Sequence, residues 1–105
     1  MEWKDSPIFP DRYEVSNTGL IRSKSYLKVV NRRGKIIQWI TKAKILAAAT
    51  NKCGYRTVML QYNNKSVTKF VHRLVAQLFV EGYSEDLEVN HKDSDRANNN
   101  SSNLE

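Results

Sequence analysis

Hydrophobic and polar residues alternate along much of the chain before residue 72, which is the pattern of strands that bury one face. The predicted strands cover residues 13–16, 20–23, 27–30, 36–40, 55–62 and 66–71. The triplet Asn17-Thr18-Gly19 separates the first two, and Asn and Gly favour tight turns because they tolerate positive φ. The pattern therefore predicts three antiparallel hairpins, the second of which has a basic tip.

One helix is predicted at residues 72–80, where the apolar residues follow a helical repeat. Its apolar stripe consists of Leu74, Val75, Leu78 and Phe79. Ala76 lies outside this stripe, and Gly82 ends the helix. Residues 42–50 contain helix-forming alanines without a clear pattern, so we expect a short helical turn or a loop there.

The last part of the chain is mostly polar. Residues 87–89 are expected to be extended and residues 91–100 to form a loop, since that segment has three consecutive asparagines. Ser101 or Ser102 can cap a helix that starts near Asn103, and we expect that helix to be incomplete. Together these elements predict an α+β fold with antiparallel β-hairpins and one packed helix.

The distribution of charge along the chain says more about its partners than the overall composition does. The 105-residue chain has a net charge of +6, and residues 15–80 contain thirteen Lys or Arg without one Asp or Glu. A long segment of one sign repels itself unless an anion lies nearby. We therefore expect a polyanionic partner, although a solvated basic surface would have the same composition.

The sequence also argues against membrane-spanning, secreted and disulfide-linked classes of protein. No apolar run approaches the ~18 residues that a membrane-spanning helix needs, and the acidic, aromatic start is unlike a signal peptide. The single cysteine, Cys53, excludes an internal disulfide and a cysteine-rich zinc site. We expect a cytoplasmic, intracellular protein that has no membrane partner.

The residues best suited to catalysis or metal binding lie near the end of the chain. His91 is flanked by Asn90 and Asp93, and further amides follow at Asn98, Asn99 and Asn103. A neutral imidazole can accept a proton from water, and oxygen-bearing side chains can hold a hard divalent cation. A strand, a loop and a returning helix would bring Asn103 beside Asn90 and His91. This arrangement predicts a nuclease site with one metal ion.

Two segments of the chain resemble known modules. Trp3-Lys4-Asp5, with the segment from Tyr13 to Ser23, resembles the NUMOD-type DNA-binding module of phage and intron-encoded nucleases. Val71-His72-Arg73-Leu74-Val75-Ala76, Val89-Asn90-His91-Lys92-Asp93, Asn98-Asn99 and Asn103-Leu104-Glu105 resemble the HNH endonuclease motif of the same proteins. The resemblance implies a NUMOD-type module at residues 1–50 and an HNH motif at residues 51–105. It also implies a ββα-metal fold for the HNH motif, which we expect to be truncated at its helix.

The resemblance also implies roles for particular residues. His91 is the expected general base, Asn90 and Asn103 are the expected ligands of one Mg²⁺ or Mn²⁺ ion, and Asn98 or Asn99 braces the loop. The implied reaction is hydrolysis of DNA phosphodiester bonds, with double-stranded DNA as partner and no cofactor besides the metal. Many relatives have Asp at the position of Asn90, and an amide oxygen is a neutral, weaker ligand.

Contacts with DNA phosphates are expected from basic residues in the strands and the helix. The candidates are Arg22, Lys24, Arg32, Arg33 and Arg73. Tyr26, Tyr55 and Tyr62 either contact DNA sugars or pack in the core. His72 is expected to pack or to cap the helix, and Asp93 and Asp95 to form a turn.

Two other functions remain open. The chain is alternatively a non-catalytic DNA-binding module, left from a truncated homing endonuclease. It is also compatible with an RNA-binding β-domain, which would prefer single strands and stack bases on exposed aromatic side chains.

Overall fold

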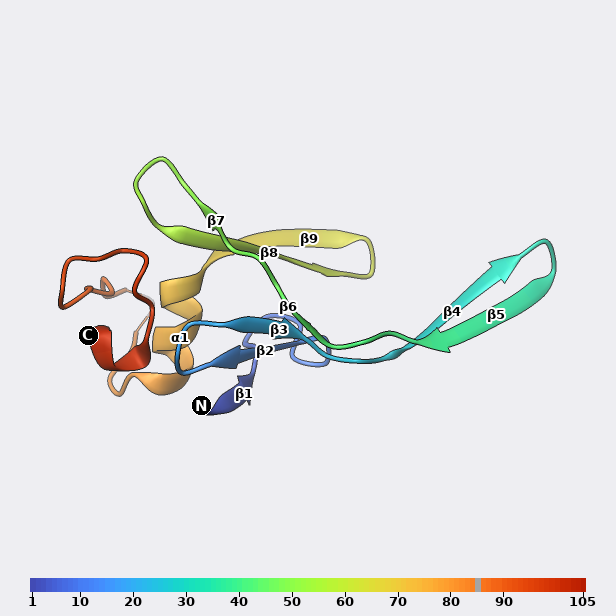
Figure 1. The fold of residues 1–105 in the computed structure, drawn as a ribbon, viewed down its shortest axis with the longest axis horizontal. Coiled ribbons are helices and arrows are strands. Elements are labelled where there is room, and N and C mark those ends of the chain that lie inside the picture. The colour runs from blue at the N-terminus through green and yellow to red at the C-terminus, as the bar shows by residue number, and fades with distance from the viewer. Residues whose placement is uncertain (85) are drawn as a thin grey trace.

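A computed structural model describes residues 1–84 and 86–105 of the chain (Figure 1). Within these residues the chain forms nine strands, one α-helix and one short 3-10 helix. In chain order they are β1 (Trp3–Asp5), β2 (Tyr13–Ser16), β3 (Ile21–Ser23), β4 (Leu27–Arg32), β5 (Lys35–Ile40), β6 (Lys44–Ile45), β7 (Ala49–Thr50), β8 (Arg56–Tyr62), β9 (Lys65–Phe70), α1 (Val71–Phe79) and η1 (Ser101–Asn103). The predicted α+β fold is confirmed, and so are its three hairpins and its helix.

The strands form three antiparallel sheets. One has the order β1-β2-β3-β6, the second contains β7-β8-β9, and the third is the isolated pair β4-β5. In the first sheet Val15 pairs with Ile21, and in the second Leu60 pairs with Val67. Short turns join the hairpin strands because residues such as Gly19 and Asn64 adopt positive φ there.

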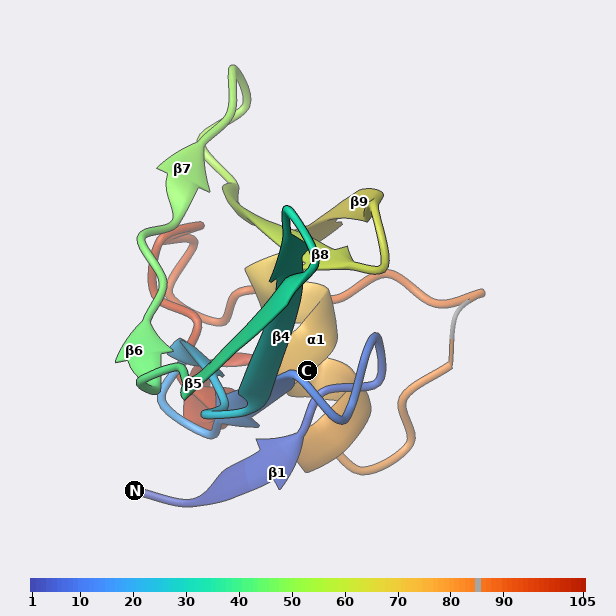
Figure 2. The same ribbon diagram turned by 90° about the vertical axis from the view of Figure 1, so that its right-hand side faces the viewer.

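One hydrophobic core joins the first two sheets. Figures 1 and 2 show α1 between the β1–β3 strands and the β8–β9 strands, and it contacts both. The buried apolar side chains are Val15, Ile21, Val58, Leu60, Val71, Leu74, Val75, Ala76 and Leu104. The first two come from the N-terminal sheet, so the core contains side chains from both predicted domains.

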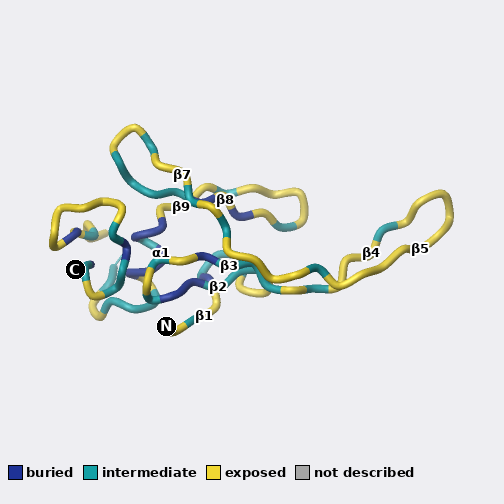
Figure 3. Tube along the Cα trace, viewed as in Figure 1, coloured by how far each residue is buried: buried dark blue, intermediate teal, exposed yellow. Residues whose placement is uncertain are grey.

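The β4–β5 hairpin lies outside this core. It projects along the longest dimension of the molecule, whose extents are 55 × 28 × 23 Å, and it is exposed along nearly its whole length (Figures 1 and 3). Ile36 and Ile40 are each 72% exposed. We call this hairpin, residues 27–40, the ribbon.

Two details of the predicted structure were wrong, and a third prediction was confirmed only in part. Residues 42–50 form no helix and contain loop residues, as one of the two predictions had it, but Lys44–Ile45 (β6) and Ala49–Thr50 (β7) pair with the edges of β3 and β8, because these ladder bonds outweigh the helix propensity of alanine. Ala76 is buried, since α1 is enclosed by two sheets and the C-terminal segment. Asn100 caps η1 in place of a serine, and its side chain accepts a hydrogen bond from the Ser102 amide.

None of the helices in the described part of the chain has the length and apolar character needed to cross a membrane.

Candidate functional site

His91 is positioned by a short antiparallel pairing between residues 90–92 and 103–105. The backbones of Asn90 and Glu105 exchange two hydrogen bonds of 2.9 and 3.0 Å, and the Lys92 amide donates to the Asn103 carbonyl at 2.8 Å. His91 lies opposite Leu104 in this pairing, and both are buried. Since side chains alternate along extended backbone, Asn90 and Glu105 lie on the exposed side.

One hydrogen bond orients the imidazole of His91. Its Nε2 lies 2.8 Å from Oδ1 of Asn99, and the two residues are only 6% and 5% exposed. Because an amide oxygen can only accept, Nε2 carries the proton, and Nδ1 holds the lone pair in the neutral ring. Nδ1 has no hydrogen-bond partner among the described residues and is not sealed from solvent.

A hollow of about 190 Å³ opens beside this ring. Its lining residues are Tyr55, Val89, Asn90, His91, Ser94 and Arg96. The guanidinium carbon of Arg96 lies 4.7 Å from the centre of the Tyr55 ring, and Arg96 also donates a hydrogen bond to the Cys53 carbonyl. Arg96 therefore adds a positive charge to the hollow. We did not predict this role, although Arg96 is one of only two basic residues after residue 80.

A second histidine lies behind the first. The ring centres of His72 and His91 are 5.2 Å apart, and Tyr55 lies 5.0 Å from His72. His72 packs, as expected, but its buried Nδ1 has no hydrogen-bond partner. Burial, His91 and Arg73 together lower the pKa of His72 to about 4. His72 is therefore neutral at pH 7 and places no charge beside His91.

The polar loop between the two paired segments is held by Asn103. Its Nδ2 donates to the Asp93 carboxylate and to the Asn98 carbonyl, both at 2.9 Å, and its Oδ1 accepts from the Asp93 amide at 3.2 Å. Asn98 also donates to Asp93, at 2.9 Å. These bonds lower the pKa of Asp93, with Asn98 as the largest cause, followed by the Asp95 amide and Asn103.

Asn103 therefore differs in position from the other predicted ligand. Both ends of its amide are bonded within the loop, and Asn103 does not line the hollow. Asn90 does line the hollow, and its Nδ2 donates to Oε1 of Glu105 at 2.9 Å. Its amide oxygen accepts no hydrogen bond from the described residues.

Few groups in this site are suited to hold a metal. Among residues 1–84 and 86–105, no three His, Cys, Asp or Glu side chains gather as a metal site would require. Asn90 lines the hollow beside His91 and is bonded to the Glu105 carboxylate, so these two residues bring an amide oxygen and a carboxylate to the edge of the hollow. This set fits a hard cation such as Mg²⁺, which takes one or two protein oxygens and completes its shell with water and substrate phosphate.

The N-terminal module contacts the site directly. The Ser101 amide donates to the Asn17 carbonyl at 2.7 Å, which attaches the β2–β3 turn to the C-terminal segment. Gly19 lies so close to Asn99 that a Cβ at this position would be 3.0 Å from the Asn99 Cβ and carbonyl oxygen. Asn99, which orients His91, is thus supported by a turn some eighty residues earlier in the chain.

The five predicted phosphate contacts do not form one surface. Arg22 pairs with Glu14 at 2.8 Å, and Lys24 pairs with Asp5 at 2.6 Å. Arg32 and Arg33 lie at the tip of the ribbon, while Arg73 lines a separate hollow beside α1. The charges of Arg22 and Lys24 are already balanced within the protein, so the ribbon tip and Arg73 are the better candidates.

The geometry describes a class: a basic β-rich protein with one oriented histidine in a polar hollow. The NUMOD4 motif model matches residues 1–61, and the HNH endonuclease model matches residues 69–105. The chain is 40% identical over 104 residues to DNA endonuclease I-HmuI of Bacillus phage SP01, covering 99% of this chain and 51% of that protein. It is 39% identical over 104 residues to the uncharacterized HNH endonuclease L245 of Acanthamoeba polyphaga mimivirus, covering 99% of this chain and 26% of L245.

A solved structure agrees with these matches. It is described as DNA binding and cleavage by the HNH homing endonuclease I-HmuI, and it superposes with a TM-score of 0.76 at 39% identity. The superposition covers 99% of this chain and 51% of that one. The NUMOD4 model covers more than half of the chain, so the chain belongs to the NUMOD4 family, and its last part matches the HNH endonuclease model, which confirms the resemblance. It spans about half, or less, of the length of these relatives.

The contact between Gly19 and Asn99 predicts that Gly19→Ala destabilises the protein more than Gly82→Ala. Both glycines have positive φ, +95° and +80°, so alanine costs about 1 kcal/mol of backbone strain at either position. Only at Gly19 does the added Cβ also meet Asn99, whereas at Gly82 it meets nothing within 4 Å. Urea denaturation compares the two variants, and equal losses would show that the close packing on Asn99 is dispensable.

The buried His72 predicts that stability falls in mild acid. The pKa of His72 is about 4 in the folded protein against an ordinary 6.5, so below pH 6.5 the unfolded chain binds the proton more readily. The stabilisation is complete above pH 6.5 and is lost as the pH falls toward 4. We expect the free energy of unfolding to drop by about 2 kcal/mol between pH 7.5 and pH 5. Urea denaturation at both pH values should show a smaller drop for His72→Phe, and equal drops would contradict this assignment.

Proposed function

We propose that the chain is a DNA endonuclease of the HNH type, which hydrolyses phosphodiester bonds in double-stranded DNA. The observation that supports this most is the state of His91. Its Nε2 is bound by buried Asn99, and its Nδ1 is left without a partner beside an open hollow. A proton acceptor that is fixed in one tautomer and reached from solvent is what a general base requires.

In this proposal His91 accepts a proton from an attacking water molecule. The water oxygen bonds to phosphorus, the bond to the leaving deoxyribose oxygen breaks, and the water proton moves to Nδ1. The Asn99 amide oxygen accepts the hydrogen bond from Nε2–H both before and after this transfer, so the ring keeps its orientation. His72 stays neutral behind it and adds no charge next to His91.

HNH endonucleases generally use a divalent metal. Mg²⁺ or Mn²⁺, when bound, would stabilise the charge that develops on the phosphate and on the leaving oxygen. We propose that the Asn90 oxygen holds the ion with help from Glu105, which supplies the carboxylate charge that position 90 lacks. Asn103 in this proposal braces the Asp93 turn, because both ends of its amide are already bonded there.

The second candidate is a DNA-binding module without catalytic activity. It is favoured by the amide at position 90 and by the lack of a three-residue metal cluster in the part of the chain that the structure describes. The two candidates predict the same binding and differ only in cleavage.

Removing the imidazole is the test of catalysis. We expect the wild-type protein to nick supercoiled plasmid with Mg²⁺ or Mn²⁺ and to stop when EDTA is added. His91→Ala should reduce the rate by about 10²-fold or more, since no other base lies in the hollow. Met59→Ala, at an exposed position on β8, serves as the control for substitution itself. If neither the wild-type protein nor His91→Ala cleaved the plasmid, the result would favour the non-catalytic module.

The different positions of Asn90 and Asn103 predict different defects. Asn90→Ala should raise the metal concentration needed for half-maximal cleavage, while Asn90→Asp should lower it. Asn103→Ala should instead reduce the free energy of unfolding, because it removes three hydrogen bonds that hold the Asp93 turn. Metal titration of the nicking rate and urea denaturation separate these effects. If Asn103→Ala changed the metal requirement at unchanged stability, Asn103 would be a ligand, as the sequence predicts.

A further inference from the structure

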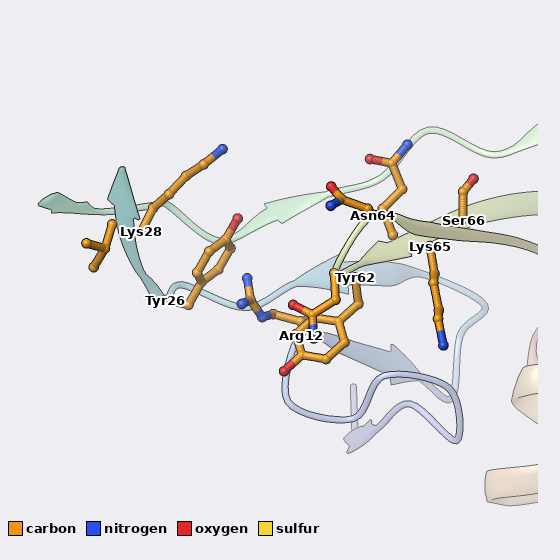
Figure 4. A pocket seen from close by; sticks show the side chains of 10 residues that line it. Arg12, Tyr26, Lys28, Tyr62, Asn64, Lys65 and Ser66 are labelled. Atoms are coloured by element: carbon orange, nitrogen blue, oxygen red, sulfur yellow. The ribbon is translucent and has the colours of Figure 1, made fainter. Parts of the chain in front are cut away.

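Another hollow, of about 680 Å³, lies between the start of the ribbon, at residues 26–29, and the β8–β9 turn (Figure 4). We call it the basic hollow. Tyr26 and Lys28 line it from the ribbon side, Tyr62 and Lys65 line it from the hairpin, and Arg12 lies between them. None of the residues that line it is acidic. Arg12, Tyr26 and Lys28 fall within the NUMOD4 match, but none of the residues that line this hollow is among the five predicted phosphate contacts.

Arg12 is held in the basic hollow by aromatic rings. Its guanidinium carbon lies 3.5 Å from the centre of the Tyr26 ring and 4.8 Å from that of Tyr62. Within residues 1–84 and 86–105 the ion pairs are Arg22–Glu14 and Lys24–Asp5, so no carboxylate neutralises Arg12. Stacking on rings fixes the plane of a guanidinium and leaves the N–H groups at its edge able to bind a phosphate.

The surroundings favour the backbone of a duplex over an unpaired base. Lys28 and Lys65 add two positive charges on opposite walls of the hollow. Arg12 covers one face of the Tyr26 ring and one face of the Tyr62 ring, so a base could not stack on those two faces. Phosphate oxygens need cations and N–H donors rather than ring faces, and this hollow offers both.

The position of the basic hollow suits a long ligand. Figure 1 shows the ribbon at one end of the molecule and the C-terminal segment at the other, with the β8–β9 turn between them and pointing toward the ribbon. The long axis measures 55 Å, which corresponds to about 16 base pairs at 3.4 Å per base pair. A duplex of this length along the axis would extend from the C-terminal segment to the ribbon.

We propose that the basic hollow is a second DNA-backbone site, in which Arg12, Lys28 and Lys65 bind phosphates of the duplex away from the cleaved bond. This inference rests on the proposed function for its ligand, duplex DNA. It does not depend on catalysis, because phosphate binding needs neither His91 nor a metal. It also gives the ribbon a role, since the ribbon supplies one wall of the site.

The test measures binding of a fluorescently labelled 20-base-pair duplex in EDTA, which prevents cleavage, between 50 and 200 mM salt. Lys28→Gln and Lys65→Gln should each reduce the slope of log affinity against log salt by about 0.9, and should weaken binding about five- to tenfold at 100 mM salt. Lys4→Gln is the matched control, because it also removes one positive charge, and the Lys4 ammonium is already bonded within the protein to the Leu78 carbonyl at 2.9 Å. It should leave the slope nearly unchanged.

Arg12→Lys tests the geometry apart from the charge. Lysine keeps the positive charge but lacks the planar edge, so binding should weaken although the net charge is the same. Thermal melting identifies any variant that fails to fold, and the two lysine variants test the site without altering the stacked arginine.

Three outcomes would overturn the inference. The first is that Lys28→Gln and Lys65→Gln give the same salt slope as Lys4→Gln. The second is that the wild-type protein does not bind the duplex at 50 mM salt. The third is that single-stranded RNA displaces the labelled duplex more effectively than unlabelled duplex does. The first can occur while plasmid is still cleaved, in which case only the basic hollow is rejected. Reduced slopes without plasmid cleavage would retain the basic hollow and reject the catalytic proposal.

Discussion

The hydrogen bond between His91 and Asn99 is the interaction on which this protein's candidate chemistry depends. It is 2.8 Å long and buried, and it leaves Nδ1 as the only basic atom of the ring. Buried hydrogen bonds of this kind hold only when the surrounding packing holds. Here the packing comes from Leu104 beside His91 and from Gly19 against Asn99. The N-terminal module is therefore part of the support of the candidate site.

The charge distribution of the molecule follows from where its acids lie. Glu14 and Asp5 neutralise Arg22 and Lys24 within the first sheet and its flanking loop, whereas the ribbon and the basic hollow have no acid among their residues. Positive charge therefore remains at the end of the molecule farther from His91. In our proposals one end positions the duplex through its phosphates and the other end acts on one bond, which is a common separation of affinity from chemistry in nucleic-acid enzymes.

Much of the fold was predictable because it depends on local patterns. The alternation in residues 55–71 and the stripe containing Leu74 and Val75 each require only one buried face, and both patterns were confirmed. Predictions failed where neighbours distant in sequence decided the outcome. Residues 44–45 and 49–50 form strands because strand edges were available, and Ala76 is buried because a second layer covers α1. Propensity and periodicity contain no information about such neighbours.

The sequence by itself determined the type of fold, the long acid-free segment and the family motif around His91. All three can be read from residue types and from their spacing along the chain, without knowledge of which segments meet in space. Only the tertiary structure decided how the side chains of the candidate site are used. It placed Asn99 on His91 and Asn103 in the Asp93 turn, although both are asparagines in the same polar loop. It also placed Arg12 between Tyr26 and Tyr62, which are far apart in the sequence. The reason is that hydrogen bonding and stacking depend on distance in space, which folding sets.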